Sequence, residues 1–195
     1  MPCFTPGTTI ATPAGACAVE DLCVGDRVTT RDNGAQIIRW IGRRDLDHQA
    51  LRAAPELQPV LIAEGALGQG MPERDLLLSP HHRVLISGEE TALYFENRDI
   101  LLAARHLTGL SGVDAVETTQ VGYVHFVFDH HEVVLADGAW TECFQPADQA
   151  LRGSDRAQRD EVLCLFPELR QMPALVEPWP ARMRRRSGEA HWLIH

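Results

Sequence analysis

The sequence has neither a long hydrophobic run nor a basic leader followed by an apolar segment. A membrane-spanning helix needs roughly 18 or more consecutive apolar residues, and no such run occurs. Met1-Pro2-Cys3 also leaves no room for the charged and hydrophobic regions of a secretory signal. We therefore expect no membrane span and a cytoplasmic location at synthesis, although an export signal read from the tail would leave no hydrophobic mark.

Positive charge is scarce as well. The chain has 18 Lys and Arg against 27 Asp and Glu, which gives a formal net charge of -9. Binding to nucleic-acid phosphates requires clustered Lys and Arg. The one basic cluster runs from Arg182 to Arg186 in the tail, and we interpret it as a solvated chain end. We expect no nucleic-acid partner, and the oligomeric state stays open.

Paired cysteine motifs are missing too. No Cys-x-x-Cys pair occurs among the five cysteines, which are Cys3, Cys17, Cys23, Cys143 and Cys164. An odd number leaves at least one thiol unpaired and argues against a disulfide scaffold or a structural zinc ribbon. We expect no cofactor and no metal site.

The chain is rich in short strand-like segments. Its 195 residues, 45% of them hydrophobic, are enough for one domain with a substantial core and an appendage. Alternation and β-branched or aromatic content predict strands at Thr8–Thr12, Arg27–Arg31, Ala35–Ile41, Val60–Ala63, Leu76–Leu78, Arg83–Ile86, Tyr123–Phe128 and Glu132–Leu135. The pattern predicts an all-β main domain.

Turns and helices are fewer. Asp32-Asn33-Gly34 predicts a type I′ hairpin turn, and short helical patches are expected at 19–24 and 98–106. After Pro146 the pattern changes to an amphipathic segment at 149–171 and then to a proline-rich extension. We therefore divide the chain into a domain at 1–148 and a helical and extended tail at 149–195.

Two motifs carry reactive groups. Cys3-Phe4-Thr5-Pro6-Gly7-Thr8 places a thiol before a turn and a strand, and Ser79-Pro80-His81-His82-Arg83 places a hydroxyl three residues before an imidazole. A cysteine thiol can attack the carbonyl of the preceding residue and convert that peptide bond into a thioester. The reaction needs an activated thiol, a stabilised oxyanion and a proton for the departing nitrogen. Histidine suits the last task.

Together the two motifs resemble the Hint superfamily, the self-processing modules of hedgehog proteins and inteins. The resemblance covers about residues 3–148, includes the stretch 19–28, and at Trp40–Arg44 and 103–107 it is closest to bacterial, stand-alone members. It implies an antiparallel, horseshoe-shaped Hint fold. It also implies Cys3 as the nucleophile, His82 rather than His81 at the scissile amide, and Ser79 or backbone amides at the oxyanion.

The carboxyl side departs from the intein pattern. Inteins end in His-Asn followed by Cys, Ser or Thr, because asparagine cyclisation breaks the second bond. Here Thr141-Glu142-Cys143 stands at that place. We therefore expect cleavage at the amino side only, without splicing, by a single-turnover cysteine autoprotease. Its substrate is its own upstream polypeptide, and water or another nucleophile accepts the thioester.

Three further residues are second-tier candidates. By resemblance, His125 lies near the position where inteins often carry an assisting Asp, and His131 lies near a histidine that precedes the final strand. The position of the hedgehog base corresponds to Gly42, which cannot act as one. Cys143 could form a redox-sensitive disulfide with Cys3, because Hint folds bring their two ends together.

Two other functions stay open at the level of the sequence. A catalytically silent Hint scaffold could act as a binding module, with the tail as its contact. A zinc protein would use Cys3 and the histidines at 81, 82, 125, 130 and 131, which are ligand types that zinc accepts. However, no pair among them has a strong zinc spacing, and adjacent histidines on a strand point to opposite faces.

Overall fold

The structure is a computed structural model that describes residues 3–87, 99–143 and 166. These residues form an all-β domain in which strands greatly outnumber helical turns, as the sequence predicts. The strands are β1 (Thr9–Thr12), β2 (Gly15–Ala18), β3 (Arg27–Thr30), β4 (Gly34–Ile37), β5 (Trp40–Leu46), β6 (Val60–Ile62), β7 (Leu76–Leu78), β8 (Arg83–Ser87), β9 (Asp99–Ala103), β10 (Val113–Ala115), β11 (Val121–Val127), β12 (Glu132–Ala136) and β13 (Ala139–Cys143). The helices are η1 (Val19–Asp21), α1 (His48–Ala53), η2 (Pro55–Leu57) and η3 (Ala104–His106).

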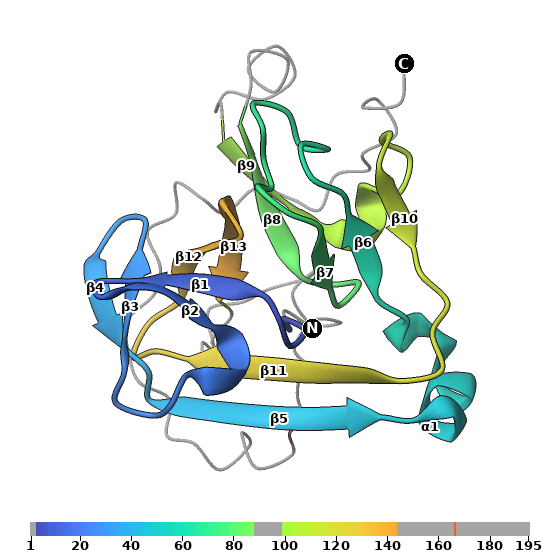
Figure 1. The fold of residues 1–195 in the computed structure, drawn as a ribbon, viewed down its shortest axis with the longest axis horizontal. Coiled ribbons are helices and arrows are strands. Elements are labelled where there is room, and N and C mark those ends of the chain that lie inside the picture. The colour runs from blue at the N-terminus through green and yellow to red at the C-terminus, as the bar shows by residue number, and fades with distance from the viewer. Residues whose placement is uncertain (1–2, 88–98, 144–165, 167–195) are drawn as a thin grey trace.

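The strands pair antiparallel in three sheets. The largest follows the order β2-β1-β12-β13-β8-β9, with β3 pairing both β12 and β4, and a smaller sheet has the order β10-β6-β7. The third consists of β5 and β11, which run side by side along one edge of the molecule in Figure 1. Phe4 forms isolated bridges with Leu78 of β7 and with Val124 of β11. The described start of the chain therefore lies between these two strands.

The β5–β11 ribbon sets the two faces of the core. Its register runs from Val121 opposite Leu46 to Val127 opposite Trp40. Because side chains alternate along a strand, Val121 and Tyr123 join one hydrophobic cluster, whereas Val124 and Phe126 join the other. His125 is two residues from Tyr123 on β11, so its side chain points to the same face of the ribbon as that of Tyr123. The ribbon thus separates a main core from a smaller cluster that contains Cys3.

The structure corrects several predicted elements. Residues 99–103 form strand β9 instead of a helix, because backbone pairing with β8 outweighs the helix propensity of a Leu- and Ala-rich segment. The hairpin at 31–34 is present, but among its residues only Gly34 has positive φ, so the turn is not type I′. A two-residue turn with positive φ at both positions occurs at Asp137-Gly138, between β12 and β13.

The tail falls largely outside the described residues. The predicted helix at 149–171 is not part of them, apart from Phe166. Among the described residues, no helix has the length and apolar character needed to cross a membrane.

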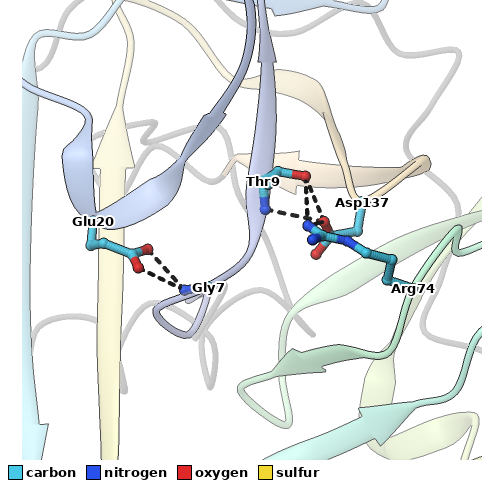
Figure 2. A network of polar contacts seen from close by, with 5 residues as sticks. All are labelled: Gly7, Thr9, Glu20, Arg74 and Asp137. Carbon is cyan, nitrogen blue, oxygen red and sulfur yellow. Dashed lines mark hydrogen bonds and ion pairs between the residues drawn. The ribbon is translucent and has the colours of Figure 1, made fainter.

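Asp137 connects three parts of the fold that are distant in sequence. Its carboxylate accepts hydrogen bonds from the Thr9 amide at 3.1 Å and the Thr9 hydroxyl at 2.6 Å, and it forms an ion pair with Arg74 (Figure 2). Its side chain is 3% exposed, against 57% for that of Arg74. Nearby, the Gly7 amide donates to Glu20. The network fixes the segment that follows Cys3.

We predict that Asp137 contributes more to stability than its arginine partner. Asp137→Ala leaves the Thr9 donors without their buried acceptor and should lower the free energy of unfolding by about 2 kcal/mol, measured by urea denaturation. Asp137→Asn is the control, because it keeps a carbonyl oxygen and tolerates positive φ. Arg74→Ala should lower stability less, since Arg74 is largely exposed. An equal or larger loss for Arg74→Ala would contradict this ranking.

Candidate functional site

Cys3 enters the domain as part of an extended segment between β7 and β11. The Phe4 amide donates to the Val124 carbonyl at 2.9 Å, and the Val124 amide donates to the Phe4 carbonyl at 2.8 Å. On the other side, Phe4 forms an antiparallel bridge with Leu78. The Thr5 hydroxyl donates to the Leu77 carbonyl at 2.9 Å. Because both neighbours hold the backbone, Cys3 has a fixed position and direction.

The predicted Ser79–His82 motif forms a turn against this segment. The His82 amide donates to the Ser79 carbonyl at 3.0 Å, which is the bond that closes a four-residue turn. Pro80 occupies the second position, where its fixed φ favours such a turn. The turn brings the serine hydroxyl and the imidazole to the backbone of Cys3.

Each polar atom of the Cys3 backbone has a partner in this turn. The Cys3 amide donates to Ser79 Oγ at 2.9 Å, and the Ser79 amide donates to the Cys3 carbonyl at 3.1 Å. His82 Nδ1 lies 3.1 Å from the same carbonyl. A carbonyl oxygen only accepts, so Nδ1 carries the proton. Ser79 is therefore at the nitrogen of the bond before Cys3, while His82 contacts the peptide group after it.

His82 is neutral at pH 7. Burial away from water lowers its pKa to about 3, although the hydrogen bond to the Cys3 carbonyl and the charge of Glu142 act in the opposite direction. The edge of its ring meets Phe4 at a centroid distance of 4.5 Å. Within the described part of the chain, its buried Nε2 atom has no hydrogen-bond partner. The imidazole therefore offers a proton on Nδ1 and a lone pair on Nε2.

The Cys3 side chain lies on the opposite side of the β5–β11 ribbon from the main core. It is completely buried and belongs to the smaller cluster, with Tyr123 and Phe166 among its members. His125 is also buried, with its ring 6.1 Å from Trp40 and 6.2 Å from Phe166 between centroids. The candidate His125 thus lies in the aromatic group beside the nucleophile.

Gly42 lies directly opposite His125 in the ribbon. A Cβ atom there would overlap the Trp40 ring and come within 2.9 Å of Phe166 Cδ1. The position that corresponds to the hedgehog base therefore has no room for a side chain, and Trp40 and Phe166 occupy the space instead.

The carboxyl-side candidates belong to other contacts. His131 Nε2 lies 3.1 Å from Glu142 Oε1, to which Arg83 Nη1 donates at 3.3 Å. The Cys143 thiol donates to the Phe126 carbonyl at 2.8 Å. No disulfide joins Cys3 and Cys143, and the two residues belong to different clusters. This arrangement gives the proposed disulfide no support.

Sequence reasoning identified the central residues but missed two partners. Phe166 was assigned only to an amphipathic tail segment, and no motif relates it to Cys3. Glu142 was treated as a replacement for asparagine, whereas the structure shows a buried carboxylate that is 2% exposed and paired with Arg83 and His131. Glu142 is the one charged residue in the stretch 138–145, and no sequence motif relates it to Arg83 or His131.

A family model described as Hint domain matches residues 2–148. Similar solved structures include the gp41-1 intein, at 12% identity over 72% of this chain and 98% of that one, with a TM-score of 0.42. A bacterial intein-like domain from Clostridium thermocellum has 17% identity over 74% and 99%, with a TM-score of 0.41.

A further similar structure is a splice-inactive variant of the AceL NrdHF class 3 split intein. It has 14% identity over 72% of this chain and 95% of that one, with a TM-score of 0.44. A search of curated proteins finds no match. The resemblance inferred from the two motifs is thereby confirmed through the family model, which covers most of the chain: this protein belongs to the Hint domain family.

Proposed function

We propose that this domain cleaves the peptide bond before Cys3 through a thioester. The Hint family match supports an autoprocessing or splicing-type domain in general. In the proposed step, the Cys3 sulfur attacks the carbonyl carbon of the preceding residue. A C–S bond forms and the C–N bond breaks, and the net proton transfer is from the thiol to the Cys3 nitrogen, which becomes an amine. Water or another nucleophile then attacks the thioester and releases the upstream polypeptide.

The hydrogen bond between the Cys3 amide and Ser79 is the observation that carries this proposal. As the carbonyl carbon becomes tetrahedral, the nitrogen gains a lone pair and no longer needs an acceptor. The Ser79 hydroxyl can then reverse its role and donate to that nitrogen. Stabilising and protonating the leaving group in this way typically accelerates a reaction by about 10² to 10⁴.

His82 has a matching role in the proposal. Its Nδ1 proton is held at the Cys3 carbonyl, and the Cys3 nitrogen belongs to the same residue. In the proposed step the ring rotates and brings this proton from the Cys3 carbonyl oxygen to the Cys3 nitrogen. Until then the hydrogen bonds from His82 and the Ser79 amide keep the Cys3 backbone in place. His125 is a further candidate, because its ring packs against Phe166, which belongs to the same cluster as Cys3.

Cleavage without splicing fits the carboxyl end of the domain. Asparagine cyclisation uses the amide nitrogen as the nucleophile, and a carboxylate has no such nitrogen. Glu142 Oε1 is also held by Arg83 and His131. We therefore propose that the reaction ends with hydrolysis or transfer of the thioester at the amino side.

A silent Hint scaffold that binds a partner is the second candidate. It is favoured by the complete burial of Cys3, which keeps external nucleophiles away from the sulfur. For the zinc alternative, the described residues hold no group of three or more His, Cys, Asp or Glu side chains arranged to bind a metal.

The test of autoprocessing uses the full chain with Met1-Pro2 replaced by a soluble reporter that ends in glycine. We expect cleavage before Cys3, faster with added thiol and abolished in Cys3→Ala, as read by intact mass. Ser79→Ala and His82→Ala should each slow cleavage by about 100-fold or more, and Ser79→Thr should restore activity. His81→Ala is the matched control and should cleave normally. An intact fusion under all conditions would instead favour the silent scaffold.

The low pKa of His82 predicts an acid-dependent loss of stability. Below about pH 6.5 the unfolded chain protonates this imidazole, whereas the folded protein keeps it neutral down to a pKa of about 3. The free energy of unfolding is therefore unaffected by this group above about pH 6.5, and it decreases as the pH falls from there toward 3.

His82→Asn removes this titration while retaining a nitrogen donor. Between pH 7 and pH 5, wild type should lose about 2 kcal/mol more unfolding free energy than His82→Asn, measured by urea denaturation at each pH. His48→Asn makes the same change at an exposed histidine and serves as the control. Equal slopes for wild type and His82→Asn would show that His82 titrates alike in the folded and unfolded states.

A further inference from the structure

Phe166 lies far beyond the last strand in sequence, yet it is buried within the domain. Only 2% of it is exposed, and it belongs to the same cluster as Cys3. The family match ends at residue 148, before Phe166. A residue from outside the matched domain therefore contributes to the surroundings of the nucleophile.

The site that holds Phe166 is aromatic and well shaped. Trp40 meets it edge to face, at a centroid distance of 5.3 Å and an interplanar angle of 79°. The His125 ring lies closer to parallel with Phe166, at 6.2 Å and 27°, and the Trp40 and His125 rings are themselves 6.1 Å apart between centroids, so the three rings pack together. Both edge-to-face and offset parallel arrangements are favourable for aromatic rings. Residues on two strands, β5 and β11, thus form a pocket that fits an aromatic side chain.

The absence of a side chain at Gly42 leaves room for the Phe166 ring. This glycine lies on β5 opposite His125, and a Cβ atom at this position would overlap the Trp40 ring and come within 2.9 Å of Phe166 Cδ1. Its φ is not in the left-handed region, so backbone conformation does not demand glycine here. Close approach of the Trp40 and Phe166 rings is the reason that a side chain is excluded.

We propose that this pocket, formed by Trp40, Gly42 and His125, binds Phe166 as a cover over Cys3. The covered thiol is shielded from water and from dissolved nucleophiles, and it becomes reachable when Phe166 leaves. The occupant is a named residue of this chain, and Cys3, which belongs to the same cluster as Phe166, is completely buried. The shielding itself needs no autoprocessing; only its use in controlling the thioester acceptor rests on the proposed function.

The reactivity of Cys3 toward iodoacetamide tests the cover directly. In the full-length chain, Phe166→Ala should raise the labelling rate of Cys3 by about tenfold or more, because labelling follows the population of the open state. Phe166→Leu keeps apolar bulk and should stay closer to wild type. Trp179→Ala truncates another tail aromatic as the matched control. Mass spectrometry of digested peptides reads each cysteine separately.

Cys143 reports whether the whole domain has opened. It is 3% exposed, and burial together with the Glu132 and Glu142 charges raises the pKa of its thiol well above the usual value. A rise at Cys3 alone is the expected result. The proposal is overturned if Phe166→Ala leaves Cys3 labelling unchanged, if Cys143 labelling rises equally, or if Trp179→Ala has the same effect as Phe166→Ala.

This outcome is separable from that of the proposed function. Labelling measures access to the thiol in the uncleaved chain, whereas the reporter fusion measures cleavage. Faster Cys3 labelling in Phe166→Ala together with an intact reporter fusion would uphold the cover and reject autoprocessing. Cleavage of the reporter fusion together with unchanged Cys3 labelling in Phe166→Ala would uphold autoprocessing and reject the cover.

Discussion

The pairing of Phe4 with both β7 and β11 is the constraint on which the site depends. It converts the first residues into an inserted strand, and it fixes which side chains point to which face. Phe4 then packs in the main core against Phe126, at a centroid distance of 5.5 Å, while Cys3 points into the smaller cluster. The backbone of Cys3 is left facing the turn that begins at Ser79. Cys3 therefore meets the Ser79 and His82 side chains through strand pairing rather than through side-chain flexibility.

The turn from Ser79 to His82 could be predicted from the sequence, because its signals are local. A proline after Ser79 predicts a turn, and a turn of this length brings residues 79 and 82 together. The atoms that they contact could not be predicted, since the amide and carbonyl of Cys3 face the turn only after pairing with distant strands. Residues 99–103 were misjudged for the same reason: their strand forms on β8. The turn at Asp137-Gly138 was missed although its sequence is a strong hairpin signal.

The buried charge of Glu142 is stabilised by its neighbours. Its carboxylate is buried, and the Arg83 and His131 side chains both lie at one of its oxygens. A buried carboxylate without such partners would be costly. It also favours the protonated form of His82, but the desolvation of that ring outweighs it, and the imidazole stays neutral. Burial rather than nearby charge thus sets the protonation state at the turn.

A completely buried nucleophile is compatible with self-cleavage, because the first step is intramolecular. The thiol of Cys3 needs to reach the carbonyl carbon of the residue before it in the same chain, and excluding water does not hinder that approach. The second step differs, since the acceptor must come from outside. Phe166 lies on the side of the thiol and leaves the turn at Ser79 and His82 in place. If both proposals hold, a cover in that position separates the two proposed steps: it permits thioester formation while closed and admits the acceptor only when it opens.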